Sequence, residues 1–163
     1  VYDEVAAKYS DVERDYAYID AFTQWIIRTP ERYDVAVAPN EFGDIATDLA
    51  AVLQGGMGIA AGGNIGDAHG MFEPIHGSSP KHAGQDKVNP IAMIMAAQMM
   101  LDWLGTRKGD RKLLDAAKGV EAAVAAVLKE GRTLTYDLGG TAKCSEVGTA
   151  IAAKVASSKK KKR

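Results

Sequence analysis

The chain has 163 residues, of which 47% are hydrophobic and 25% are charged, and its formal net charge is -1. This balance is typical of a folded globular protein, and the near-neutral charge provides no general attraction to nucleic acid or to a membrane surface. No apolar run approaches the roughly 20 residues that span a bilayer. Cys144 is the only cysteine, which excludes an internal disulfide and favours a reducing, cytoplasmic compartment.

The first third of the chain predicts helices that alternate with extended segments. The helices show apolar residues at helical spacing, and the extended segments are rich in β-branched or aromatic residues. Proline after Thr29 and the glycine pair Gly55-Gly56 end two of the helices. In chain order, we expect a helix over residues 1–10, a strand over 12–19, a helix over 21–28, a buried strand over 34–38 and a helix over 44–53.

Glycine dominates residues 55–70. The apolar runs within and after this segment predict strands and tight loops, because such runs are not left in water. Pro90 opens a long helix, since proline costs little in a first helical turn. Strands that alternate with helices predict an α/β fold. The further elements are strands within 57–61 and 71–75, a polar loop over 76–87, helices over 90–104, 111–128 and 145–155, and an extended piece over 133–138.

The two ends of the chain differ from those of an ordinary domain. The first residues read like the middle of a helix and lack an initiator methionine, so we expect the chain to begin inside a larger protein. Residues 157–163 end in a run of lysines and one arginine. A basic run of this kind binds an anionic surface or stays a solvated tail, and we expect a disordered tail.

Two acids follow the predicted strand over 34–38. Asp44 and Asp48 are four residues apart on a predicted helix, so their side chains lie on one face within reach of one ion. Mg²⁺ and Mn²⁺ prefer such oxygen ligands. Acids in a first helical turn are also favoured by the helix dipole alone, and the spacing by itself leaves both interpretations open.

The segment Asn40-Glu41-Phe42-Gly43-Asp44-Ile45-Ala46-Thr47-Asp48 resembles the metal signature of the metal-dependent β-decarboxylating dehydrogenases, the family of isopropylmalate and isocitrate dehydrogenases. The resemblance implies that Asp44 and Asp48 bind Mg²⁺ or Mn²⁺. It also implies that Asp20 completes the coordination sphere, or its second shell, across the interface of a homodimer with a shared active site.

Residues 71–78 and the pair Asn89-Pro90 are similar to the dinucleotide-binding loop of the same family. The resemblance implies that His76 contacts the adenine of NAD or NADP, that Gly77 and Ser78 offer close backbone approach, that Asn89 binds the adenine edge and that Glu73 lies near the nicotinamide. Small residues permit such an approach, and an amide both donates and accepts hydrogen bonds. Taken alone, a histidine in a glycine loop is more often a turn residue.

Lys81 occupies a position where members of the family that use NAD place an aspartate. A lysine suits the additional 2′-phosphate of NADP, and Tyr136 falls where bacterial NADP-dependent isocitrate enzymes use a tyrosine on that phosphate. Those enzymes carry a tyrosine in place of His82 and an arginine near residues 138–140, where this chain has leucine and two glycines. A solvated surface lysine remains the alternative interpretation.

The resemblance implies an incomplete isopropylmalate/isocitrate dehydrogenase-like fold with a mixed sheet flanked by helices. Residues 1–54 would close the smaller, dimer-forming domain and residues 55–156 the larger, dinucleotide-binding one. An isolated chain would then expose apolar sheet edges, so we expect a dimer or poor solubility. In the family, the acid–base pair lies upstream, and no catalytic residue is identifiable here.

The implied reaction is the oxidation and decarboxylation of a 2-hydroxy acid. Residues 73–74, 90–92 and 138–142 are more similar to isopropylmalate enzymes, which favours 3-isopropylmalate and leucine biosynthesis, whereas residues 62–67 and 143–146 are more similar to isocitrate enzymes. The alternatives are an NADP-type isocitrate dehydrogenase, a non-catalytic partner subunit or fragment of such an enzyme, and a nucleotide-binding module without metal chemistry.

Overall fold

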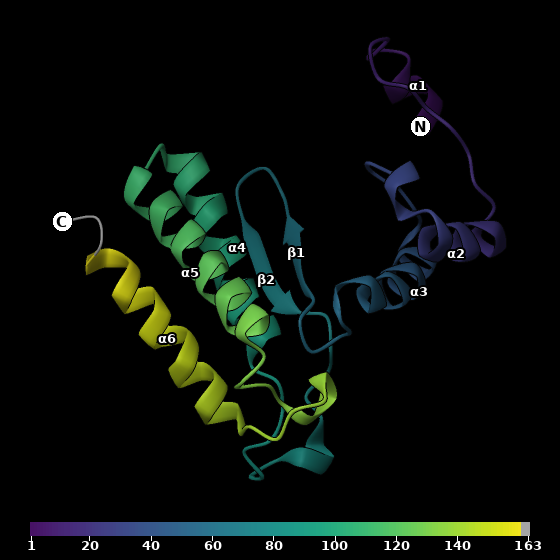
Figure 1. The fold of residues 1–163 in the computed structure, drawn as a ribbon. Coiled ribbons are helices and arrows are strands. Elements are labelled where there is room, and N and C mark those ends of the chain that lie inside the picture. The colour runs from purple at the N-terminus through teal and green to yellow at the C-terminus, as the bar shows by residue number, and fades with distance from the viewer. Residues whose placement is uncertain (161–163) are drawn as a thin grey trace. The chain divides into compact units, whose positions relative to one another are not determined.

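The computed structural model describes residues 1–160. Contacts between residues divide the chain into two units, Val1–Ala50 and a second unit that begins at Ala51 (Figure 1). This division lies a few residues ahead of the boundary expected after residue 54. The elements of the first unit are α1 (Tyr2–Ala6), α2 (Ile19–Arg28), the 3-10 helix η1 (Pro30–Arg32) and α3 (Asn40–Ala50).

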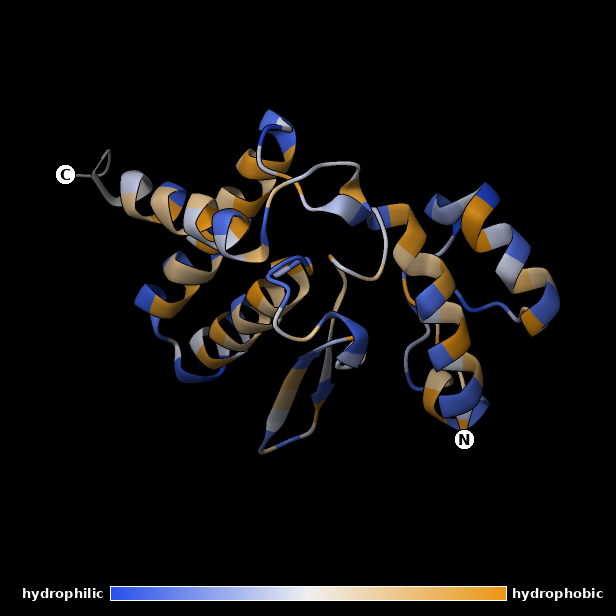
Figure 2. Ribbon diagram, turned by 90° about the horizontal axis from the view of Figure 1, so that it is seen from below, coloured by the Kyte–Doolittle hydropathy of each residue, from blue (hydrophilic) through white to orange (hydrophobic). Residues whose placement is uncertain are grey.

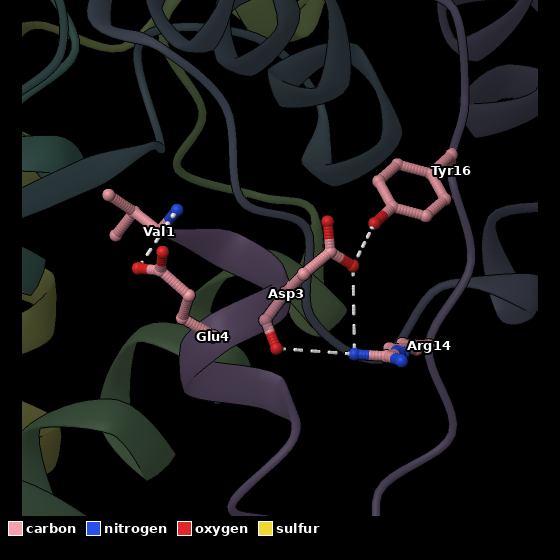
Figure 3. Close-up of polar contacts among 5 residues, drawn as sticks. All are labelled: Val1, Asp3, Glu4, Arg14 and Tyr16. Atoms are coloured by element: carbon pink, nitrogen blue, oxygen red, sulfur yellow. Dashed lines mark hydrogen bonds and ion pairs between the residues drawn. The ribbon is translucent and has the colours of Figure 1, made fainter.

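Asp3 ties α1 to the extended segment that follows it (Figure 3). The Tyr16 hydroxyl donates a hydrogen bond to the Asp3 carboxylate, and Arg14 Nη1 lies 3.6 Å from the same carboxylate. The bond to Asp3 raises the pKa of Tyr16, because the phenol can donate only while it is protonated. These side chains are exposed, so the contacts order the segment without forming a core.

Helices α2 and α3 carry hydrophobic and hydrophilic residues in alternating bands (Figure 2), as expected of amphipathic helices. Phe22 of α2 meets Tyr33 edge-on, with the ring centroids 5.0 Å apart. The first turn of α3 closes when Gly43 donates its N–H to the Pro39 carbonyl at 2.8 Å. Ala46 is the buried residue of α3, so the helix presents most of its side chains to solvent.

The second unit is a β-hairpin covered by helices (Figure 1). Its elements are η2 (Ala51–Gln54), β1 (Ala61–Ile65), β2 (Gly70–Pro74), η3 (Pro80–His82), α4 (Ile91–Lys108), α5 (Arg111–Glu130), η4 (Tyr136–Leu138) and α6 (Cys144–Lys160). The two strands pair antiparallel, with Gly63 opposite Phe72. Helix α4 packs on the hairpin, where the ring of Trp103 lies 5.9 Å from that of Phe72. Helix α5 packs on α4, and α6 packs on α5.

The core of this unit forms where α4, α5 and α6 meet. Ile91 of α4 is fully buried, and Val124, Val127, Val147 and Ile151 of the other two helices are each at most 5% exposed. Burial of side chains of this size stabilises a fold by about 1.5–3 kcal/mol each. Because Ile91 is the first residue of α4, the core fixes the point at which the preceding loop enters that helix.

The strands predicted over residues 12–19 and 34–38 are wrong for the described chain. Neither segment pairs with another strand, since the sheet of the described residues is the β1–β2 pair. Val35 and Val37, predicted to be buried, are 85% and 79% exposed. The residue pattern favours extended backbone, but a strand forms only when a neighbour satisfies its N–H and C=O groups.

The final helix is longer than predicted. Helix α6 continues to Lys160, past the expected end at residue 155 and into the predicted tail, in keeping with the favourable interaction of cations with a helix C-terminus. Residues 161–163 of that tail lie outside the described residues. Within the described part of the chain, no helix combines the length and the apolar character needed to cross a membrane.

Candidate functional site

Two of the predicted metal-binding acids are exposed on α3. Asp44 and Asp48 lie about one helical turn apart, so their carboxylates project from one side of the helix. Neither carboxylate has a hydrogen-bond or ion-pair partner within residues 1–160. Thr47, which lies between them in the sequence, donates its hydroxyl to the Gly43 carbonyl at 2.9 Å and not to either carboxylate. Two unpaired carboxylates are the donor chemistry that Mg²⁺ and Mn²⁺ prefer.

Asp20 lies in the first turn of α2, where its Oδ1 accepts the N–H of Ala21 at 2.8 Å. Its side chain is exposed. In the described chain, no three His, Cys, Asp or Glu side chains come together as a metal site, so Asp20 does not join Asp44 and Asp48 within one chain. The predicted contribution of Asp20 across a dimer interface is the arrangement that would bring the three acids together.

Strand β2 carries Glu73 and leads into the glycine loop. The Glu73 carboxylate is exposed and accepts a hydrogen bond from Asn64 Nδ2 of β1 at 3.3 Å. His76 is half-buried, with Nδ1 2.8 Å from the Gly77 carbonyl. Gly77 and Ser78 are exposed, and a Cβ added to Gly77 would meet no atom within 4 Å. The backbone at this turn is therefore open to close approach, as the predicted dinucleotide role requires.

A cluster of basic and aromatic side chains lies beside Tyr136 of η4. The ring of His82 is 6.0 Å from that of Tyr136, and Lys87 Nζ is 5.0 Å from the centroid of the same tyrosine ring. His82 Nδ1 is shielded from solvent and has no hydrogen-bond partner among the described residues. Lys81 adjoins His82 in η3 and is exposed.

Lys87 and His82 were not among the residues predicted to bind the dinucleotide, whereas Lys81 and Tyr136 were. The sequence placed Lys87 in the same loop as Lys81, but nothing in the spacing indicated that its ammonium group reaches the face of Tyr136. A cation over an aromatic ring is attracted by the negative face of the ring. The cluster therefore combines positive charge with a phenol hydroxyl, a combination that suits a phosphate ester.

Asn89 is 7% exposed and is engaged in polar contacts at both ends of its amide. Its Nδ2 donates to Asp137 Oδ2 at 2.9 Å, and its Oδ1 accepts the N–H of Ile91 at 3.0 Å at the start of α4. A second oxygen of Asp137 accepts the Thr135 hydroxyl. Asn89 thus joins α4 to η4, and one amide hydrogen remains for the predicted contact with an adenine edge.

Asp86 links the loop to the first turn of α6. Its Oδ1 accepts the N–H of Ser145 at 2.9 Å, its Oδ2 accepts the Ser145 hydroxyl at 2.6 Å and its carbonyl accepts the N–H of Cys144 at 2.9 Å. The bond from the Ser145 hydroxyl, followed by that from the Ser145 N–H, lowers the pKa of Asp86, and the charge of Lys143 acts in the same direction. Burial, followed by the Asp86 charge, raises the pKa of the Cys144 thiol.

At low pH, we expect Asp86 to lose its contribution to stability. Its folded-state pKa lies below the ordinary value of 3.8, so the contribution is present above that value and is lost as the pH falls through the folded pKa. Between about pH 5 and about pH 2.5, the wild type should therefore lose more free energy of unfolding than an Asp86→Asn variant, because the asparagine side chain at position 86 does not titrate. Urea unfolding at each pH measures both proteins, and parallel pH profiles would contradict the prediction.

The chain matches the family model of isocitrate/isopropylmalate dehydrogenases over residues 1–151. It belongs to this family, and the resemblance inferred from its motifs is confirmed. All the residues predicted to bind metal or dinucleotide lie inside the matched region. The names of the relatives do not choose between the two substrates, because enzymes of both kinds match at similar identity.

The 3-isopropylmalate dehydrogenase of Thermobifida fusca is 44% identical over 156 residues, which cover 94% of this chain and 41% of the relative. The mitochondrial NAD isocitrate dehydrogenase subunit alpha of Homo sapiens is 42% identical over 154 residues, 93% of this chain and 40% of the relative. The crystal structure of isocitrate dehydrogenase from Methylococcus capsulatus matches with a TM-score of 0.85 at 41% identity, covering 94% of this chain and 44% of that one. The chain is thus part of an α/β fold and spans about two fifths of its relatives' length.

Proposed function

We propose that the protein carries out the oxidative decarboxylation of a 2-hydroxy acid, with hydride transfer to NAD(P) at a divalent-metal site, and that 3-isopropylmalate is the acid. The observation that carries this proposal is the presence, in one family-matched chain, of two unpaired carboxylates on α3 and a glycine loop held beside Tyr136. The first feature suits a divalent ion and the second suits a dinucleotide. The reaction needs both.

Asp44 and Asp48 would hold the Mg²⁺ or Mn²⁺ ion, with Asp20 of a second copy completing the site. The bound ion would supply Lewis-acid chemistry at the substrate oxygens. The two carboxylates would contribute oxygen donors to the ion. Hydride would leave C2 of the hydroxy acid for the nicotinamide while the hydroxyl proton passes to a base. The resulting 2-oxo acid would lose its β-carboxylate as CO₂, and the enolate left behind would take up a proton at the carbon that carried the carboxylate. No described residue is assigned the role of acid or base.

For the dinucleotide, the charges favour NADP over NAD. Lys81 is a cation that cannot accept hydrogen bonds from ribose hydroxyls, and the Lys87 ammonium lies over the Tyr136 ring in the same region. Positive charge and a phenol hydroxyl would both bind a 2′-phosphate. Glu73, His76, Gly77, Ser78 and Asn89 would contact the rest of the cofactor in the roles that the resemblance implies.

The substrate assay separates the main alternatives. The purified protein is incubated with Mn²⁺ and each combination of 3-isopropylmalate or isocitrate with NADP or NAD, and reduced cofactor and CO₂ are measured. The proposal expects the highest kcat/KM with 3-isopropylmalate and NADP. Preference for isocitrate would identify the second enzyme instead. Tight Mn²⁺ and dinucleotide binding without turnover would favour a non-catalytic partner subunit, or a fragment that lacks its acid–base half.

A homodimer with a shared site makes a distinctive prediction. Asp20→Asn and Asp44→Asn variants should each be inactive alone, since each damages both sites of its own dimer. In a mixed dimer, one site would combine the intact α3 acids of the Asp20→Asn chain with the intact Asp20 of the Asp44→Asn chain. The other site would carry both substitutions. Random exchange should then restore roughly a quarter of the wild-type rate, because half of the dimers are mixed and each has one intact site.

The control is a mixture of Asp44→Asn with Asp48→Asn, which both damage the same half of the site. This mixture should stay inactive, because no pairing of the two chains assembles an intact set. If mass spectrometry detects subunit exchange between the Asp20→Asn and Asp44→Asn variants but their mixture stays inactive, the site is not shared. Sedimentation of the active protein as a monomer would also contradict a shared site.

A further inference from the structure

The first turn of α6 is capped from outside the helix. The residue ahead of it, Lys143, has no side-chain oxygen to accept the exposed N–H groups of that turn. Glu146 accepts the N–H of Lys143 at 2.8 Å, which is half of a capping box. Asp86 satisfies the next two N–H groups, since its carbonyl accepts that of Cys144 and its carboxylate accepts that of Ser145.

The same residue fixes the loop that holds the basic cluster. Asp86 precedes Lys87, whose ammonium lies over Tyr136. Earlier in the loop, Gln85 donates its side-chain amide to the carbonyl of Lys81 at 2.7 Å. On its other side, the loop is joined to η4 through Asn89. The loop is therefore fastened at two points, Asp86 and Asn89. Lys87 lies between them, and Gln85, next to Asp86, holds the backbone of Lys81.

The backbone of Asp86 is in an unfavourable region for a residue with a side chain. Its φ is 50°, in the left-handed region that glycine adopts freely and that asparagine and aspartate adopt more often than other residues. A residue kept there at a conformational cost needs a compensating interaction. Both carboxylate oxygens of Asp86 provide one, since they accept two hydrogen bonds from Ser145.

We propose that Asp86 is a positioning residue for dinucleotide binding, which fastens residues 79–89 to the start of α6 and so holds Lys81 and Lys87 ready for the phosphate of NADP. It acts through these lysines and does not touch the cofactor. The inference rests on the proposed function, because it assumes that the loop binds a dinucleotide. A loop held in its binding arrangement loses less conformational entropy when the ligand arrives.

The test compares three single variants and one double variant of the full protein. Asp86→Gly removes both side-chain bonds and relieves the positive φ. Asp86→Asn keeps the shape, since its amide oxygen can accept from the Ser145 N–H and its NH₂ can donate to the Ser145 hydroxyl oxygen. Ser145→Ala removes one of the two bonds. Dissociation constants for NADPH are measured from its fluorescence, and KM and kcat are measured with whichever hydroxy acid the protein oxidises.

We expect Asp86→Gly to weaken NADPH binding and raise the KM for NADP roughly tenfold, with kcat changed by less than about twofold. Asp86→Asn should remain within about twofold of the wild type, and Ser145→Ala should lie between the two. Adding Ser145→Ala to Asp86→Gly should have no further effect, because the bond it removes is already lost.

The outcomes distinguish this inference from the function on which it rests. If the wild type binds NADPH and Asp86→Gly binds it equally tightly, Asp86 is only a turn residue and the inference is overturned. A fall in kcat with an unchanged KM would overturn it as well. If the wild type binds neither NADPH nor NADH, the proposed dinucleotide function fails, and the inference fails with it.

Discussion

Asp44→Asn and Asp48→Asn are each expected to lower kcat/KM by at least about a thousandfold, because Lewis-acid stabilisation by a bound metal is worth several kcal/mol. Asparagine keeps the size of aspartate and removes its charge, so the fold should survive. Neither carboxylate has a partner within the described residues, so its loss leaves no other group unpaired. Steady-state kinetics across a range of Mn²⁺ concentrations measures the effect, and Mn²⁺ binding followed by electron paramagnetic resonance should weaken in parallel.

The matched control is Asp102→Asn, which removes one exposed helical carboxylate from α4, outside the candidate sites. It should leave kcat/KM and Mn²⁺ affinity near those of the wild type. Full activity in Asp44→Asn, at a Mn²⁺ concentration that does not saturate the wild type, would mean that Asp44 is a solvated acid on the surface of α3. The metal proposal would then be wrong.

Lys81→Asp is expected to shift the preference from NADP towards NAD by about a hundredfold or more in the ratio of kcat/KM values. The change would remove the proposed charge-assisted bond to the 2′-phosphate and supply an acceptor for the ribose hydroxyls, and bonds of this type contribute about 1.5–3 kcal/mol each. Lys87 would remain beside Tyr136, so NADP binding should be weakened without being abolished. Initial rates with each cofactor measure the ratio.

Lys118→Asp serves as the control, since Lys118 is an exposed lysine of α5 outside the loop. It changes the net charge of the protein by the same amount and should leave the cofactor ratio unaltered. An equal effect of both substitutions would assign the shift to the overall charge. An unchanged ratio in Lys81→Asp would make Lys81 a solvated surface lysine, the alternative that its sequence position leaves open.

Features that depend on neighbouring residues were predictable from the sequence. Apolar residues at helical spacing predicted a helix over residues 44–53 with Asp44 and Asp48 on one side, and α3 has that arrangement although it begins at Asn40 and ends at Ala50. Pro90 predicted the start of α4, because its backbone restriction acts locally, although the helix runs to Lys108, past the expected end at residue 104. The apolar run over residues 71–75 predicted β2 for the same kind of reason.

Features that depend on distant partners were not predictable. The first strand of the hairpin was expected within residues 57–61, but β1 lies later, where Gly63 leaves space under the ring of Phe72; a Cβ there would approach the ring to 3.2 Å. The link from Asp86 to Ser145 joins residues 59 positions apart. Neither residue has a local pattern that marks it as a cap, because the hydrogen-bond partner comes from elsewhere in the chain.

The origin of the α6 cap has a consequence for the order of folding. Most helix caps form together with their own helix, from residues next to it. The cap supplied by Asp86 must instead wait until α4 and α5 have brought the two segments together, after a long loop has closed. We therefore expect the start of α6 and the loop of Asp86 to be completed late in folding and to open together, before the helical core does.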